Sequence, residues 1–168
     1  MKNKPERISN PFPPVVDENA HVLILGSLPS EASRAAGFYY MNPRNRFWGM
    51  LSALLDENFE KLSAPEKKDA LLRHGIALSD VVLSCEIHRS ADATIKNVVS
   101  TDVKEILSRS AVKHIFLNGQ KAYSLFLRYF PEYQKMATCL PSTSPANAKT
   151  SFPVLVKTWG EALLPYLK

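Results

Sequence analysis

The chain has 168 residues, of which 45% are hydrophobic and 22% are charged. This length and composition are typical of one globular domain that buries its own core without metal or disulfide support. The 21 basic and 16 acidic residues give a net charge of +5, which favours a polyanionic partner only weakly. Because Cys85 and Cys139 are the only cysteines, the sequence excludes a cysteine-built zinc or iron–sulfur site and a disulfide framework.

The sequence gives no sign of export or of membrane insertion. Residues 1–16 lack the apolar segment of a secretory signal, and no run approaches the length of a membrane span. We therefore expect a reduced, intracellular and soluble protein.

The predicted elements alternate between strands and helices along the chain. Residues 1–20 are polar and proline-rich, so we expect an irregular arm there. Apolar runs predict strands at 21–27, 76–83, 112–119 and 135–141. Helical spacing or capping predicts one helix that starts near Phe47 and four more at 64–75, 100–110, 120–130 and 152–168. This alternation predicts a three-layer α/β/α sandwich with a central four-stranded parallel sheet, formed by one domain over 21–168.

The ligand crevice of such a sheet lies beyond the C-terminal ends of its strands. Four short polar segments should therefore meet there: GSLPS (26–30), SD (79–80), NG (118–119) and LPSTSPANA (140–148). The aromatic stretch GFYYMNPRNRFWGM (37–50) follows the first strand and can reach the same place. It combines flat rings with guanidinium and amide groups, a mixture that a hydrophobic core does not require.

Taken singly, these segments leave their roles open. GSLPS suits a phosphate or the polar edge of a base, and it suits an ordinary strand-to-loop turn equally well. In LPSTSPANA, the hydroxyls of Ser142, Thr143 and Ser144 could donate to phosphates, or the segment could be a surface loop. Asp80 could accept N–H groups from a base, cap a helix or pair with an arginine, and Asn118 fits a pocket wall or a turn.

Other chemistries find little support in the sequence. His21, His74, His88 and His114 show no metal-ligand spacing, so we expect no metal site and no cofactor. No nucleophile elbow of the G-x-S-x-G type occurs. An enzyme with this sequence would act by positioning and electrostatics more than through a strong nucleophile.

Several of these motifs, in the same order over about residues 21–150, resemble the uracil-DNA glycosylase superfamily. LILGSLPS is similar to its first motif and LPSTSPANA to its second, while YYMNPRNRFW and GIALSDV most resemble the hypoxanthine (deoxyinosine) DNA glycosylase family. The resemblance implies a DNA glycosylase of base excision repair that flips out deaminated bases, chiefly hypoxanthine with uracil or xanthine as further substrates, and leaves an abasic site. It also implies a monofunctional, cofactor-free, cytoplasmic monomer that acts at the nucleoid and precedes abasic-site repair enzymes.

The resemblance also assigns roles to residues. Asn45 matches the catalytic amide of the family, which orients the attacking water. Tyr40 matches the ring on which the flipped base stacks. Asp80 lies near the position that reads the base edge. Leu28 is apolar where mismatch-specific relatives carry asparagine. The implied base-binding residues are Gly26, Ser27, Leu28, Tyr40, Asp80 and Asn118. The implied DNA-binding residues are Arg44, the phosphate-gripping Ser142, and Thr143, Ser144, Pro145, Ala146 and Asn147, which would enter the gap left by the base.

Some positions depart from the family pattern. Ser30 replaces a glycine, Met41 and Asn42 stand where alanine and histidine are typical, and Ser79 stands where tryptophan is common. For Arg46, packing or ion pairing is as good an interpretation as DNA binding. Two alternatives therefore stay open, a catalytically silent nucleic-acid-binding relative and a hydrolase of free nucleosides.

Overall fold

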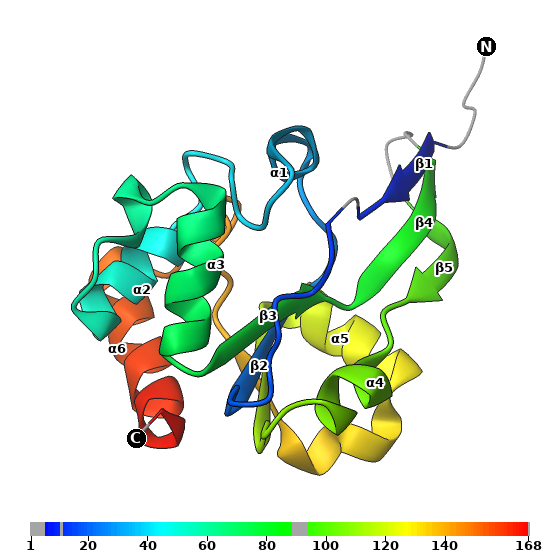
Figure 1. Cartoon of the computed structure of the whole chain (residues 1–168). Helices are drawn as coiled ribbons and strands as arrows, with labels where there is room; N and C mark the ends of the chain where they lie inside the picture. The colour runs from blue at the N-terminus through cyan, green and yellow to red at the C-terminus, as the bar shows by residue number, and fades with distance from the viewer. Residues whose placement is uncertain (1–5, 11, 89–93, 168) are drawn as a thin grey trace.

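The computed structural model describes residues 6–10, 12–88 and 94–167. Its centre is a four-stranded parallel sheet of β2 (Val22–Gly26), β3 (Ile76–Asp80), β6 (His114–Asn118) and β7 (Ala137–Leu140), in the order β3-β2-β6-β7 (Figure 1). Every residue of β2 and β3 is buried, as expected for strands covered on both faces. All four strands predicted from the sequence are present, but the one predicted over 76–83 ends at Asp80, and its last two positions, 82 and 83, belong to β4 (Val82–His88) of a second sheet.

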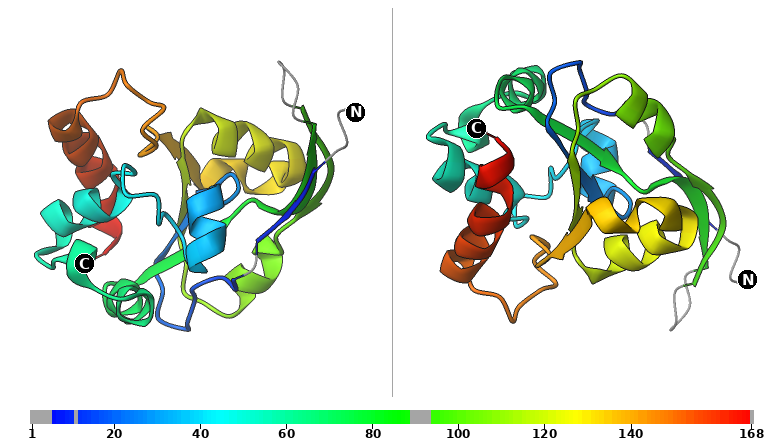
Figure 2. Two further views of the ribbon diagram at one scale, coloured as in Figure 1. Left: turned by 90° about the horizontal axis from the view of Figure 1, so that it is seen from above. Right: turned by 90° about the horizontal axis from the view of Figure 1, so that it is seen from below.

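Helices cover both faces of this sheet. On one side lie α2 (Phe47–Leu55), α3 (Ala64–Arg73) and α6 (Phe152–Leu163), and on the other α4 (Val103–Ser108) and α5 (Gln120–Tyr129), as Figure 2 shows. Side chains of β2 alternate between the two layers, since Val22 and Ile24 join the first core and Leu23 and Leu25 the second. The predicted three-layer α/β/α sandwich is therefore confirmed.

Shorter helices complete these layers. They are α1 (Glu31–Ala36), which was not predicted, and the 3-10 turns η1 (Phe59–Lys61), η2 (Pro131–Met136) and η3 (Leu164–Tyr166). Ser63 and Glu66 form a capping box that starts α3. The helix predicted over 152–168 ends as α6 at Leu163 and continues as η3, because Pro165 cannot supply a helical N–H.

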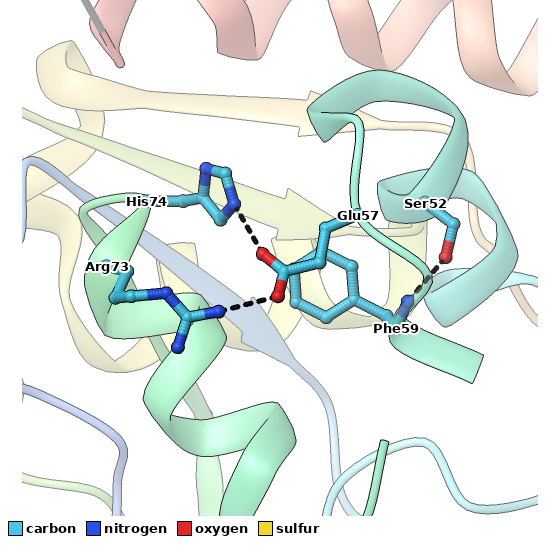
Figure 3. A network of polar contacts seen from close by, with 5 residues as sticks. All are labelled: Ser52, Glu57, Phe59, Arg73 and His74. Atoms are coloured by element: carbon cyan, nitrogen blue, oxygen red, sulfur yellow. Dashed lines mark hydrogen bonds and ion pairs between the residues drawn. The ribbon is translucent and has the colours of Figure 1, made fainter. Parts of the chain in front are cut away.

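A polar network joins the segment between α2 and η1 to the end of α3, and joins η1 to α2. The Glu57 carboxylate accepts hydrogen bonds from Arg73 at 2.5 Å and from His74 Nε2 at 2.9 Å, and Ser52 Oγ accepts one from the Phe59 N–H at 3.0 Å (Figure 3). The network lies in the helical layer around α2 and α3, and its carboxylate is only partly exposed.

A second, smaller sheet was not predicted. It is antiparallel, in the order β1-β4-β5, and consists of β1 (Glu6–Ser9), β4 (Val82–His88) and β5 (Thr94–Ser100). The expectation of an irregular arm over 1–20 is thus wrong for 6–9, and no strand was predicted between the strand at 76–83 and the helix at 100–110, where most of β4 and β5 lies. Local sequence could not show this, because β1 pairs with a strand about 80 positions away, Glu6 lying opposite Ile87.

The small sheet packs against the loop after β2. Ile8, Val82 and Cys85 form its buried interior, and Leu28 packs against that cluster. The Val82 N–H donates to the Ser27 carbonyl at 2.9 Å. The sheet therefore supports one wall of the region beyond the parallel strands. No helix among the residues that the structure describes is long and apolar enough to cross a membrane.

Candidate active site

A cavity of about 190 Å³ opens at the C-terminal ends of the parallel strands. This is below the roughly 300–1,000 Å³ of sites for drug-sized ligands and suits a single ring system. Its lining residues come from all four predicted segments, from the aromatic stretch and, in the case of Ser33, from α1: Gly26, Ser27, Leu28, Pro29, Ser30, Ser33, Tyr39, Tyr40, Asn45, Asp80, Asn118, Ser142, Thr143 and Ser144.

Most of the residues singled out in the sequence meet at this cavity. All six base-binding candidates line it together with Asn45 and three residues of the loop after β7. Four DNA-binding candidates lie outside its lining: Arg44, Pro145, Ala146 and Asn147. Among these four, Arg44, Pro145 and Ala146 are exposed and Asn147 is partly exposed.

Strand register forms the floor of the cavity. Gly26 is the last residue of β2 and pairs directly with Asp80, the last residue of β3. A Cβ atom at position 26 would lie 2.6 Å from Asp80 Oδ1 and 2.8 Å from the Tyr40 hydroxyl oxygen. Since real Cβ atoms do not approach other atoms so closely, only glycine leaves this corner of the cavity intact.

Asp80 is a buried carboxyl at this floor. It is 4% exposed, and burial raises its pKa to about 7, because desolvation disfavours the charged form. Its Oδ2 accepts a hydrogen bond from Asn10 Nδ2 at 3.2 Å. Asn10 follows β1, and no pattern in the sequence indicated that it would contact Asp80.

Tyr40 lies beside Asp80 in a constrained conformation. Its φ of 56° is in the left-handed region, which a non-glycine residue seldom adopts and which is frequent at functional sites. Its ring stacks on Phe47, with centroids 4.1 Å apart and planes 23° apart. Its hydroxyl is buried and has no hydrogen-bond partner in the part of the chain that the structure describes. Burial, and then the charge of Asp80, raise its pKa, so the hydroxyl keeps its proton.

The remaining rings of the aromatic stretch belong to the core. Phe38, Tyr39, Phe47 and Trp48 are all buried, and the Trp48 indole donates to the Tyr39 carbonyl at 3.2 Å. The stretch therefore has two roles. Its buried rings pack in the core, and by doing so they hold Tyr40 and the following polar residues against the cavity.

Asn45 has its carbonyl oxygen fully engaged. Oδ1 accepts hydrogen bonds from the Phe47 N–H at 2.9 Å and from the Thr143 hydroxyl at 2.8 Å. Its Nδ2 group forms no hydrogen bond with any residue that the structure describes, and the side chain lines the cavity. The position just before α2 thus gives Asn45 an anchored oxygen and an available NH₂ group.

Thr143 joins Asn45 to a second amide. The Thr143 N–H donates to Asn118 Oδ1 at 3.0 Å, and Asn118 Nδ2 donates to the Thr143 hydroxyl at 3.0 Å. The sequence suggested that Thr143 enters DNA, but the residue is fully buried (0% exposed). In this structure it links two side chains of the cavity wall.

Arg46 holds the loop after β7 in place. Its backbone N–H donates to the Thr143 carbonyl at 3.0 Å, and its guanidinium donates to five backbone carbonyls, those of Ser142, Thr143, Ser144, Asn147 and Thr150. From α6, the Trp159 indole donates to the Pro141 carbonyl at 2.8 Å. Of the interpretations open for Arg46, packing against backbone carbonyls is the one that the structure supports.

Ser142 and Ser144 of this loop accept hydrogen bonds through their hydroxyl oxygens and can still donate their hydroxyl hydrogens. Ser142 Oγ accepts from the Ser144 N–H at 3.1 Å, and Ser144 Oγ accepts from the Ala146 N–H at 3.1 Å. Each hydroxyl uses a lone pair and keeps its hydrogen, which can donate to an anionic oxygen. Within residues 6–10, 12–88 and 94–167, no group of three or more His, Cys, Asp or Glu side chains is placed to hold a metal ion.

Comparisons with known proteins identify relatives of this chain. The family model of the uracil DNA glycosylase superfamily matches residues 13–163. Two curated proteins named hypoxanthine DNA glycosylase are similar: one from Methanosarcina acetivorans, 36% identical over 86% of this chain and 91% of its own, and one from Methanosarcina barkeri, 32% identical over 90% and 95%.

A solved structure is also similar. It is a solution NMR structure titled as a candidate uracil DNA glycosylase from Methanosarcina acetivorans, with a TM-score of 0.75 and 31% identity over 89% of this chain and 95% of that one. Because the family model spans nearly the whole chain and the curated relatives exceed 30% identity, this chain belongs to the uracil DNA glycosylase superfamily.

Proposed function

We propose that this protein is a monofunctional DNA glycosylase that flips deaminated bases, chiefly hypoxanthine, out of DNA and hydrolyses the N-glycosidic bond. The observation that carries the proposal is the cavity of about 190 Å³ in which a ring, a buried carboxyl and an anchored amide, those of Tyr40, Asp80 and Asn45, meet. The names of the two curated relatives support hypoxanthine as a substrate. Uracil and xanthine are further candidates.

Each part of the cavity suits one step of this reaction. Extruding a base costs a few kcal/mol, least for a mispaired one, and stacking on an aromatic ring returns about 1–3 kcal/mol. The Tyr40 ring, supported from behind by Phe47, is the proposed platform. Asp80 lies at the end of the cavity that a stacked base would face, where it can hydrogen-bond to the base edge.

The chemical step needs charge stabilisation more than a nucleophilic side chain. The bond between the sugar C1′ and the base nitrogen breaks with its electron pair moving to the base, and the sugar gains oxocarbenium character. The oxygen of a water molecule bonds to C1′, and its proton leaves to solvent or to the departing base. Asn45, whose amide is fixed at the cavity wall, is the proposed group that positions reactants at this stage.

The loop after β7 is the proposed contact to the DNA backbone. Ser142 and Ser144 each keep a hydroxyl hydrogen available for a phosphate oxygen. Arg44 is exposed and is the proposed cationic contact, whereas Pro145 and Ala146 are the exposed loop residues suited to fill the gap left by the base.

The structure weakens the case for a catalytically silent binder. That alternative rested on Ser30 and Asn42, yet both have local roles. Ser30 caps α1 by accepting the Ser33 N–H at 3.1 Å, and Asn42 accepts the Arg44 N–H at 2.9 Å. Neither departure from the family pattern removes a group from the Asn45 or Tyr40 side of the cavity.

A base-release assay tests the proposal. An end-labelled duplex with a single deoxyinosine is incubated with the protein and then treated with alkali, which breaks the strand at an abasic site. We expect alkali-dependent cleavage at the deoxyinosine, with parallel duplexes of deoxyuridine and deoxyxanthosine ranking the bases. Retarded migration of the duplex without cleavage would establish the silent binder instead, and faster hydrolysis of free deoxyinosine than of the duplex would establish a nucleosidase.

A further inference from the structure

The hydrogen bonds around Thr143 have only one consistent direction. The Phe47 backbone N–H is necessarily a donor, so the Asn45 atom 2.9 Å from it must be the amide oxygen. The Thr143 backbone N–H is likewise a donor, so the Asn118 atom 3.0 Å from it must be that amide's oxygen. Neither amide can be flipped without placing an NH₂ group against an N–H.

The direction of the Thr143 hydroxyl follows from the two amides. Asn118 presents Nδ2 to Thr143 Oγ1 at 3.0 Å, so the hydroxyl oxygen is an acceptor on that side. On the other side the hydroxyl faces Asn45 Oδ1 at 2.8 Å, an atom without hydrogen, so it must donate its own. The chain of hydrogen bonds therefore runs from Asn118 through Thr143 to Asn45.

This chain decides which groups face the cavity. Both lone pairs of the Asn45 oxygen are occupied, by Phe47 and by Thr143, so the amide can offer only N–H groups. Asn118 has a second Nδ2 hydrogen beyond the one given to Thr143. Both side chains line the cavity, so its wall presents fixed hydrogen-bond donors.

We propose that Thr143 is a positioning residue that locks the Asn45 and Asn118 amides so that their NH₂ groups act as donors to the base that leaves with negative charge. The inference rests on the proposed glycosylase function and refines it, since it assigns Asn45 to the departing base as a donor. Donors fixed before the reaction stabilise developing charge without reorganisation, and removing one such donor costs about 10²–10³ in rate where this has been tested.

The burial of Thr143 fits this role. Its side chain is closed off from solvent at 0% exposure, and its hydroxyl satisfies two partners from different elements, the turn before α2 and the end of β6. Arg46 binds the carbonyl on the same residue through its backbone N–H at 3.0 Å. The loop after β7, whose serines are the proposed DNA contacts, is therefore hydrogen-bonded to the amides of both Asn45 and Asn118.

Three variants test the inference. Thr143→Val keeps the shape and removes the hydroxyl, while Thr143→Ser keeps the hydroxyl. Thr150→Val is the matched control, because Thr150 lies in the same loop and its hydroxyl accepts from Asn147 Nδ2 at 3.1 Å, away from both amides. Single-turnover release of hypoxanthine is measured, together with affinity for a duplex carrying a tetrahydrofuran abasic analogue.

We expect Thr143→Val to release hypoxanthine about 10²-fold more slowly, the size of effect seen when a reacting group is slightly misplaced, with unchanged affinity for the abasic duplex. Thr143→Ser should restore most of the rate, and Thr150→Val should keep it. Equal rates for Thr143→Val and the wild type would overturn the inference. So would a loss of rate explained entirely by weaker DNA binding.

A second readout separates this inference from the proposed function. The side-chain NH₂ signals of Asn45 and Asn118 are followed by NMR in the free proteins. Both should shift or broaden in Thr143→Val and stay at their wild-type positions in Thr150→Val. If the wild type releases no hypoxanthine, the proposed function fails, and unchanged NH₂ signals in Thr143→Val would separately show that Thr143 does not lock the amides.

Discussion

The backbone N–H of Arg46 donates a hydrogen bond to the carbonyl oxygen of Thr143 at 3.0 Å, which joins the segment before α2 to the loop after β7. The Arg46 guanidinium extends this link, reaching Asn147 O at 3.0 Å and Thr150 O at 2.6 Å. The side that carries Asn45 and the side that carries the loop serines are thus held as one unit.

Replacing this guanidinium should loosen the loop. Arg46→Lys retains the charge, but a single ammonium cannot reach five carbonyls as a planar fork can. We expect the free energy of unfolding to fall by about 1–3 kcal/mol, since partly buried carbonyl acceptors lose their partners. Urea denaturation measures the change, and hydrogen exchange of the 142–150 amides should rise. A variant as stable as the wild type would show that the carbonyl contacts contribute little.

Arg44→Ala is the matched comparison. Arg44 is exposed and forms no ion pair with the residues that the structure describes, so the free energy of unfolding should stay within about 0.5 kcal/mol of the wild type. Loss of one phosphate contact should weaken DNA binding and reduce the slope of log K against log salt by about 1. An unchanged salt slope in fluorescence anisotropy would remove Arg44 from the DNA contact.

Adding one methyl group at the cavity floor should block the base. In Gly26→Ala the new Cβ would meet Asp80 Oδ1 at 2.6 Å and the Tyr40 hydroxyl oxygen at 2.8 Å. We expect hypoxanthine release to fall at least about tenfold, because the corner that faces the base edge is filled and its walls must move. Single-turnover kinetics on the deoxyinosine duplex measure the change.

Gly49→Ala controls for the loss of a glycine as such. Gly49 lies in α2, where a Cβ would sit 3.5 Å from the nearest atom, an ordinary contact with Glu60. This variant should keep full activity and gain up to about 1 kcal/mol of stability from helix propensity. Equal activity of the two alanine variants would mean that the Gly26 corner does not receive the base.

The Tyr40 hydroxyl, which has no hydrogen-bond partner among residues 6–10, 12–88 and 94–167, should lower the stability of the free protein. A buried hydroxyl without a partner carries a desolvation penalty of about 1–3 kcal/mol, so Tyr40→Phe should raise the free energy of unfolding by part of that amount. If the hydroxyl serves the base, the same variant should release hypoxanthine more slowly. Lower stability of Tyr40→Phe in urea would indicate that the hydroxyl is satisfied in the wild type.

Asp80 should make stability depend on pH. Burial raises its pKa from 3.8 to about 7, so the folded state holds the proton more tightly than the unfolded chain. The free energy of unfolding should then fall as the pH rises from about 4 to about 7 and level off above, by on the order of 4 kcal/mol at about 1.4 kcal/mol per pKa unit. Below pH 4 the proton is bound in both the folded and the unfolded state, so Asp80 no longer makes the free energy of unfolding depend on pH.

Asp80→Asn isolates this effect. The variant cannot ionise, so relative to the wild type it should gain stability steadily between pH 4 and pH 7. Urea denaturation of both proteins at pH 4, 5.5, 7 and 8 gives the difference. Parallel curves for the two proteins would mean that the carboxyl ionises in the folded state as easily as in the unfolded chain.

The parallel sheet could be predicted because its signals are local. The apolar runs at 21–27 and 76–83 are each visible without their partners, and a parallel sheet necessarily places the C-terminal ends of its strands together. The gathering of Tyr40, Asn45 and Asn118 around them followed from that topology.

The features that the sequence could not reveal are contacts between residues far apart in the chain. The small sheet requires β1 to find β4, and the contact of Asn10 with Asp80 spans 70 positions. The burial of Thr143 was also hidden, since a threonine between two serines in a polar loop gives no sign that its hydroxyl connects two amides. Such facts arise from tertiary packing and not from local pattern.

The most direct test of the whole account is single-turnover release of hypoxanthine by the wild type and by Asn45→Ala, each measured beside its affinity for the abasic-analogue duplex. The account predicts that the wild type releases the base, and that Asn45→Ala is slower by about 10²-fold or more while binding the duplex almost equally well. Release by Asn45→Ala at the wild-type rate would contradict it.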